Sequence, residues 1–84
     1  MEKSIFTREY DIFLRQLRAA RKAAGLTQEQ VADHLGQTQS FVSKCERGER
    51  RIDIVELRAF CQALGISLAD FVQQLETAIQ EMDK

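Results

Sequence analysis

Two short amphipathic helical patterns that meet at one glycine constrain the fold of this chain more than any other feature. Thr27 is suited to capping the first pattern, and Gly36 is suited to the left-handed backbone that ends a helix. Thr38 follows two residues later as the next cap, and Gly48 ends the second pattern. Helices this short and this close must cross at a steep angle, so residues 28–47 predict a helix-turn-helix.

The steep crossing adds a condition on the residues at the contact between the two helices. The first helix must present a small residue there, and the second must present a compact apolar one. Ala32 and Val42 meet this condition, and Phe41 and Cys45 extend the apolar stripe of the second helix. Taken alone, a glycine between two amphipathic segments also fits an ordinary small helical bundle.

Polar residues of the second helix occupy the face away from Val42 and Cys45. They are Gln39, Ser40, Ser43 and Lys44. Side chains of these types hydrogen-bond the edges of bases and the oxygens of phosphates. The pattern therefore favours a helix that is offered to the major groove of DNA.

The segment 28–47 is preceded by LRAARKAAGLTQ and followed by GERRIDIVELRAFCQALGIS. Together they resemble the lambda-repressor-like, Cro-type helix-turn-helix family, also called the XRE family, over residues 12–75 without a detectable gap. The resemblance implies an all-α, compact five-helix domain that binds double-stranded DNA with its third helix in the major groove. It does not identify an operator.

The resemblance also implies roles for individual residues. Gln39, Ser40 and Lys44 match the base-reading positions of the family, and Ser43 is a weaker candidate. A glutamine can bond adenine N6 and N7, and a lysine can donate to guanine O6 and N7. Phe41 lies either at the edge of the core or against a thymine methyl group, and we expect the core.

Phosphate contacts are expected from helix N-termini and from the basic loop after the second helix. The candidates are Gln28, Thr38, Arg47, Arg50, Arg51 and, more remotely, Lys22. Glu49 lies in the same loop and is an unfavourable neighbour for a phosphate.

The family resemblance further pairs a first-helix arginine with the glutamate that closes the reading helix. In this chain the matching residues are Arg21 and Glu46. We expect them to form a partly buried bidentate ion pair that holds the second helix of the motif to the scaffold. The alternative is two unrelated surface charges.

Three further helices complete the prediction. The first runs over residues 7–24 and stops at Gly25; the last two follow the capping pairs Asp53/Glu56 and Ser67/Asp70, with Gly65 between them. With 84 residues, the chain is expected to form one domain, with a core over 12–75 and a helical extension over 76–84.

Apolar residues in the last helix exceed what one small core requires. Ile79 and Met82 fall on the same side as Phe71 and Leu75. One domain covers little DNA, and helix-turn-helix proteins commonly pair across two half-sites. We therefore predict a homodimer through these four residues; the alternative is a frayed helix that lies on its own domain.

The charges are distributed unevenly although the net charge is only −1. Residues 1–27 carry an excess of three positive charges, residues 28–52 balance, and residues 53–84 carry an excess of four negative charges. Such a gradient is suited to turning the basic end toward phosphates and the acidic end away from them. It fits ordinary surface solvation equally well.

Other functional classes find little support in the composition. Cys45 and Cys61 are far apart and His34 is the only histidine, so we expect buried reduced thiols, a surface histidine, and neither a metal nor a cofactor. No apolar run suits a membrane span or a signal peptide, which favours the cytoplasm.

A transcriptional regulator that acts like a repressor is thus the leading interpretation. Its rivals are an antitoxin-like or other protein-binding module and, within the same biochemistry, a restriction-modification controller or a phage-type repressor. An enzyme is the least favoured class, because no paired catalytic constellation and no phosphate-binding glycine loop is present.

Overall fold

Five helices occupy most of residues 5–82, the part of the chain that the computed structural model describes. They are α1 (Ile5–Ala23), α2 (Gln28–Leu35), α3 (Gln39–Arg47), α4 (Ile54–Leu64) and α5 (Leu68–Met82). The prediction of an all-α, five-helix domain is confirmed. The charges counted at positions 2, 3, 83 and 84 lie outside the described residues, as does the end of the predicted extension.

The helix boundaries follow from the capping residues. The Thr27 hydroxyl accepts from the Gln30 backbone N–H at 3.1 Å, and the Gln30 side chain accepts from the Thr27 N–H at 2.9 Å, which completes a capping box. Thr38 accepts in the same way from the Phe41 N–H at 3.1 Å. Gly36, with a φ of 68°, ends α2 in the left-handed conformation.

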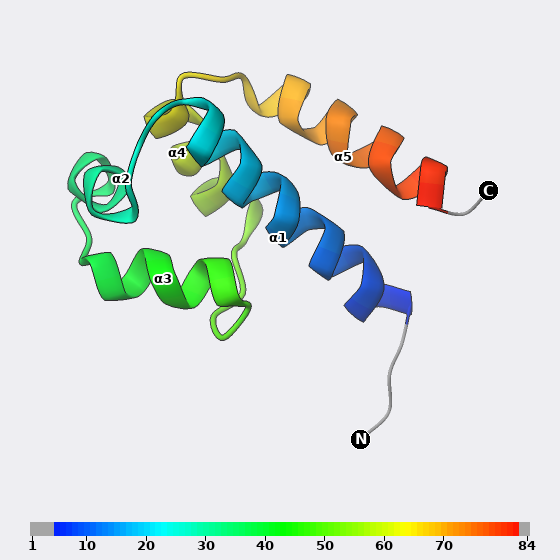
Figure 1. The fold of residues 1–84 in the computed structure, drawn as a ribbon, viewed down its shortest axis with the longest axis horizontal. Helices are drawn as coiled ribbons and strands as arrows, with labels where there is room; N and C mark the ends of the chain where they lie inside the picture. Colours follow the sequence, from blue (N-terminus) through cyan, green and yellow to red (C-terminus); the bar gives the residue numbers. More distant parts are fainter. Residues whose placement is uncertain (1–4, 83–84) are drawn as a thin grey trace.

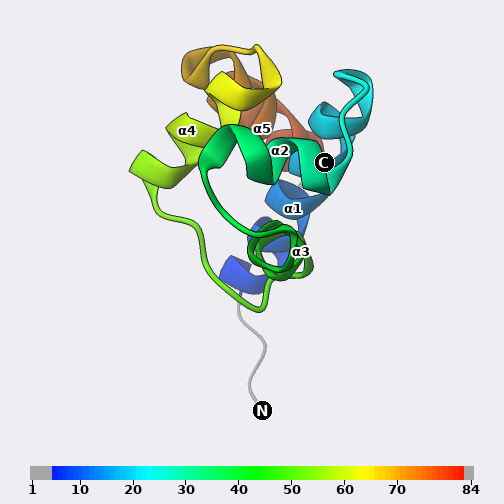
Figure 2. The same cartoon turned by 90° about the vertical axis from the view of Figure 1, so that its left-hand side faces the viewer.

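The arrangement of the helices leaves α3 at one edge of the molecule. Figure 1 shows α1 and α5 running antiparallel, with α3 on the opposite side of the molecule from α5. The view turned by 90° shows the same separation of α3 from α5 (Figure 2). The outer surface of α3 is therefore free to meet a partner that α5 does not touch.

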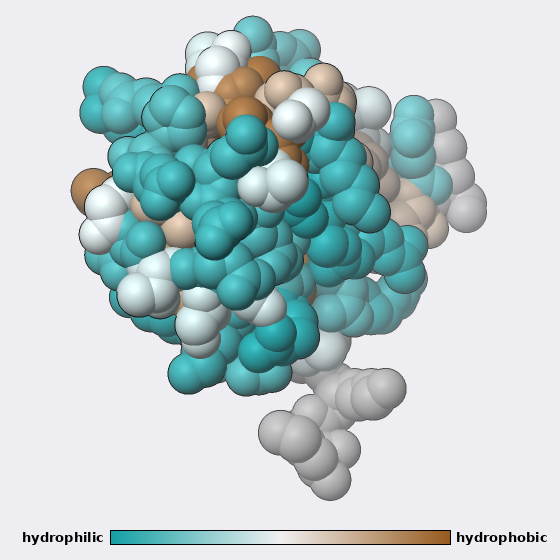
Figure 3. All heavy atoms as spheres, turned by 60° about the vertical axis from the view of Figure 1, so that its left-hand side comes forward, coloured by the Kyte–Doolittle hydropathy of each residue, from teal (hydrophilic) through white to brown (hydrophobic). Residues whose placement is uncertain are grey.

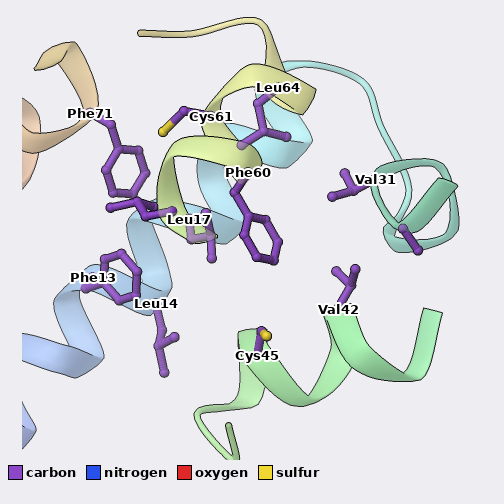
Figure 4. Close-up of a cluster of buried hydrophobic side chains, with 12 residues drawn as sticks. Phe13, Leu14, Leu17, Val31, Val42, Cys45, Phe60, Cys61, Leu64 and Phe71 are labelled. Carbon is purple, nitrogen blue, oxygen red and sulfur yellow. The ribbon is translucent and has the colours of Figure 1, made fainter. Parts of the chain in front are cut away.

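All five helices contribute to a single core (Figure 4). Leu17 of α1, Val42 of α3 and Phe60 of α4 are almost completely buried. The rings of Phe13 and Phe71 meet edge to face with their centroids 5.9 Å apart, which joins α1 to α5. This core fixes the position of α3 relative to α1 and α4.

One residue assigned to the dimer interface belongs to this core instead. Phe71 is only 1% exposed within the single chain, so the prediction that it contacts a second copy is wrong. Its ring packs against Phe13 in the core between α5 and α1, so it is not available to a second copy. Leu75, Ile79 and Met82 remain half-buried.

The two cysteines are buried, free, and part of the same core. Burial raises the pKa of both thiols, which leaves them as small apolar groups. His34 is exposed on the surface. Within residues 5–82 there is no cluster of three or more metal-ligating side chains, and no helix there has the length and hydropathy of a membrane span.

Candidate nucleic-acid interface

Helix α3 separates its side chains into a buried face and an exposed one. Val42, Cys45 and Glu46 are buried at helical spacing, whereas Gln39, Ser40 and Lys44 are exposed. Ser43 lies between the two faces and is half-buried. The residues predicted to read bases thus share the outward side of α3.

The contact between α2 and α3 has the residues that a steep crossing needs. Ala32 of α2 and Val42 of α3 are both buried in the core, and the turn after Gly36 is closed by the Gln37 N–H, which donates to the Ala32 carbonyl at 2.9 Å. Figure 3 shows the side of the molecule where α2 lies as predominantly hydrophilic. The buried side chains of α2 and α3 thus lie in the core, and their polar side chains lie together on one surface of the molecule.

Arg21 and Glu46 form a bidentate ion pair between α1 and the end of α3. Arg21 Nε donates to Glu46 Oε2 at 2.7 Å, and Arg21 Nη2 donates to Oε1 at 3.1 Å. The side chains are only 13% and 3% exposed, respectively. Arg18 adds a bond of 3.0 Å to the Glu46 carbonyl. The C-terminal end of α3 is thus fixed to α1 by charge-assisted hydrogen bonds.

A second set of hydrogen bonds fixes the N-terminal end of α3. Gln28 Nε2 donates to Glu46 Oε1 at 2.9 Å, and Gln39 Nε2 donates to Gln28 Oε1 at 2.8 Å. Gln28 is predicted to contact a phosphate, and its bonds to Glu46 and Gln39 are not among the predictions from the sequence. A signal was present: the dipeptide Thr-Gln opens both helices, so each glutamine occupies the first position after its threonine cap.

A polar hollow lies between the N-terminal ends of α2 and α3. It has a volume of about 460 Å³ and is lined by Arg21, Leu26, Thr27, Gln28, Glu29 and Gln39. Backbone N–H groups at the start of a helix favour anions. Thr38 and Lys22, which were predicted to contact phosphate, are both exposed.

The two basic residues of α3, Lys44 and Arg47, differ in their side-chain contacts. Lys44 is exposed and has no side-chain hydrogen bond or ion pair to any residue among 5–82. Arg47 donates to the Ser43 hydroxyl and to Glu49 Oε2, the latter at 2.8 Å, and this bond lowers the pKa of the Glu49 carboxyl. Both partners of the Arg47–Glu49 pair are more than half exposed, so a phosphate can compete for Arg47.

Arg50 and Arg51, which are both predicted to contact phosphate, are exposed and form contacts within the domain. The Arg50 guanidinium forms two hydrogen bonds with Glu56, which lower the pKa of that carboxyl, and it lies 4.8 Å from the centre of the Phe41 ring. Phe41 is half-buried and packs against the core, as expected. Arg51 stacks on Tyr10 at 4.4 Å. Both guanidinium groups therefore have partners within the domain, and because both arginines remain exposed, a phosphate can still compete for them.

The charge gradient has a spatial counterpart in the described residues. Helix α5 carries Asp70, Glu76 and Glu81 and has no lysine or arginine. Because α5 and α3 lie on opposite sides of the molecule (Figure 1), the acidic helix is remote from the exposed face of α3. A polyanion that approached α3 would meet Lys44 and Arg47 while keeping away from the acidic helix.

Comparisons with known proteins identify what the chain is similar to. The family described as helix-turn-helix domain matches residues 12–74. An uncharacterized HTH-type transcriptional regulator of Sinorhizobium fredii, y4dJ, is 40% identical over 52 residues, which cover 62% of this chain and 68% of the relative.

Solved structures agree with this match. An XRE-family like protein from Pseudomonas syringae pv. tomato superposes with a TM-score of 0.84 and 42% identity, over 88% of this chain and 90% of that one. The clp gene regulator ClgR from C. glutamicum superposes with a TM-score of 0.73 and 26% identity, over 83% and 91% of the two chains.

Proposed function

The chain belongs to the helix-turn-helix family of XRE type and is a DNA-binding transcriptional regulator, and we propose that it reads a specific operator as a homodimer. The proposal includes a cytoplasmic location and a repressor-like action, in which the bound domain occupies DNA that the transcription machinery needs.

The exposed polar face of α3 is the observation that carries this proposal. Gln39, Ser40 and Lys44 point away from the core on a helix whose two ends are fixed by hydrogen bonds to α1 and α2. A rigid helix with this face fits the major groove, where bases are distinguished by their donors and acceptors. In this proposal Arg47 and the N-terminal ends of α2 and α3 hold phosphates beside it.

An apolar groove supports the homodimer. It has a volume of about 360 Å³ and lies between the start of α1, the loop before α4 and the end of α5, with Tyr10, Ile52, Ile54, Leu57, Leu75 and Ile79 among its lining residues. Ile54 and Val55 at the start of α4 are 61% and 74% exposed. We propose that the same groove of a second copy covers these residues across a two-fold axis.

Selection of binding sites from a random double-stranded DNA library tests the function. We expect an enriched inverted repeat whose half-sites are about one helical turn, or about 34 Å, apart. Enrichment of single half-sites would contradict the homodimer. Salt-insensitive, sequence-independent binding that survives replacement of Gln39 and Lys44 would contradict the operator proposal and favour a protein-binding module.

Lys44→Ala is expected to weaken binding to the selected operator by about 1 to 3 kcal/mol and to relax the preference at one base pair. The reason is that Lys44 has no partner within residues 5–82 and can donate to guanine O6 and N7. Titration of every single-base variant of the operator measures this. Equal losses on all variants would reassign Lys44 to a phosphate.

Ile79→Asp is expected to convert the dimer into a folded monomer, because it places a charge in the apolar groove. Light scattering at micromolar concentration gives the mass, and circular dichroism checks the fold. Gln73→Asp adds the same charge at an exposed position of α5 outside the groove and is the control. Equal masses for both variants and the wild type would contradict the proposed interface.

A further inference from the structure

Tyr10 of α1 makes two contacts with the loop after α3, residues 48–53. Its hydroxyl oxygen accepts a hydrogen bond from the Ile52 backbone N–H at 3.2 Å. The Arg51 guanidinium lies over the Tyr10 ring, 4.4 Å from its centre. The ring of Tyr10 is in turn 5.2 Å from the ring of Phe13, which is buried in the core. Tyr10 thus joins the loop that follows the proposed reading helix to the scaffold of the domain.

The two neighbouring arginines of this loop differ in which of their groups are engaged. The Arg50 guanidinium donates to both carboxylate oxygens of Glu56 and to the Arg51 carbonyl. The Arg51 guanidinium is exposed and forms no hydrogen bond or ion pair with any group of residues 5–82. A guanidinium that stacks on a ring uses its flat face, whereas its five N–H donors point outward in its plane. Stacking on Tyr10 therefore leaves the donors of Arg51 available.

A guanidinium with available donors is suited to a phosphate, which accepts two parallel hydrogen bonds from it. Stacking restricts the rotation of a long side chain, so less conformational entropy is lost when a ligand binds. The loop and α3 lie together on the side of the molecule away from the acidic helix α5 (Figures 1 and 2). A phosphate on this side can bind Arg51 without displacing a carboxylate, whereas at Arg50 it must displace Glu56.

We infer that Tyr10 is a positioning residue for DNA binding, and that its ring holds Arg51 as the arginine of this loop that binds a backbone phosphate. The inference rests on the proposed function and extends it, because it gives a part in DNA binding to a residue of α1 that need not touch DNA. It also separates two residues that the sequence treats alike. Arg51 binds the phosphate, and Arg50 ties the loop to Glu56 of α4.

Tyr10→Leu tests the inference, because leucine is apolar and offers no aromatic face. The measurement is the slope of log K against log salt concentration, to which each phosphate contact contributes about 0.9. We expect the slope to become less steep by about 0.5 to 0.9 in Tyr10→Leu, with the base preferences of the selected operator retained. Tyr10→Phe keeps the ring and should keep the slope of the wild type. Circular dichroism checks that each variant is folded.

A single half-site is the DNA used for these titrations. Tyr10 also lines the groove proposed for the homodimer, and on a single half-site only one protomer contacts the DNA, so a loss of the dimer does not change the number of phosphates bound. Arg51→Ala should reduce the slope by about 0.9, and Tyr10→Leu should add nothing to it, because both remove the same contact. Arg15→Ala removes a charge from an exposed position of α1 and should leave the slope unchanged.

The slope separates this role from a purely structural one. An unchanged slope in Tyr10→Leu or in Arg51→Ala would overturn the inference and leave the proposed function standing. Losses that add in the double variant would also overturn it, because Tyr10 would then act by a route other than Arg51. Failure of the wild type to enrich any sequence would instead reject the proposed function, and the inference with it.

Discussion

Replacement of Arg21 by alanine is expected to lower the free energy of unfolding by about 3 to 5 kcal/mol. The Glu46 side chain is only 3% exposed and accepts two of its hydrogen bonds from Arg21. Without the guanidinium, a charge stays buried with only Gln28 as a neutral side-chain donor. Urea unfolding followed by circular dichroism measures the change.

A matched control separates the effect of breaking the ion pair from the effect of removing any arginine of α1. Arg15 is exposed on the same helix and has no ion pair within residues 5–82, so Arg15→Ala should stay within about 0.5 kcal/mol of the wild type. The double replacement Arg21→Met with Glu46→Leu should recover much of the loss, because two apolar groups leave no buried charge. Arg21→Ala with wild-type stability would show that the pair does not support the fold.

The same substitution links stability to recognition. Glu46 is joined to Arg21 on one side and to Gln28 on the other, and Gln28 holds Gln39. Binding to the operator by Arg21→Ala should therefore be weaker even at temperatures where the variant is fully folded. The double replacement should recover stability without recovering the base preference, because leucine at position 46 cannot orient Gln28.

The sequence predicts the fold well where a structural feature is determined by residues that lie close together in the chain. Thr27 and Thr38 cap helices through bonds to backbone atoms three residues away, and Gly36 adopts a backbone that other residues disfavour. All the residues that form these caps and turns lie within a few positions of one another. The boundaries of α2 and α3 could therefore be stated before any tertiary contact was known.

The remaining features depend on contacts between distant residues. The pattern places Phe71 on the apolar side of α5, but only the packing of α5 against α1 decides whether it faces the core or a partner. Arg50 and Arg51 follow α3 in the sequence, but their contacts with Phe41 and Tyr10 depend on how the loop packs against α3 and α1. The bond between Gln28 and Gln39 requires the angle at which α2 and α3 cross, which no local rule supplies.

Phe60→Ala is the second substitution with a large expected effect, about 3 to 5 kcal/mol of unfolding free energy. The Phe60 ring lies between Leu17 of α1 and the pair Val31 and Val42 of the helix-turn-helix (Figure 4), and it is almost completely buried. Its removal leaves a cavity beneath the crossing of α2 and α3. Domains of this kind are stabilised by about 5 to 15 kcal/mol in total, so much of the population can unfold.

Val55→Ala provides the control for Phe60→Ala, because Val55 belongs to the same helix and is 74% exposed. Its stability should stay within about 0.5 kcal/mol of the wild type. Operator binding by Phe60→Ala should fall further than its folded fraction predicts, since α3 rests on this side chain through Val42. Binding that follows the folded fraction alone would show that the capping bonds and the Arg21–Glu46 pair are sufficient to orient α3, and that the core beneath it contributes only stability.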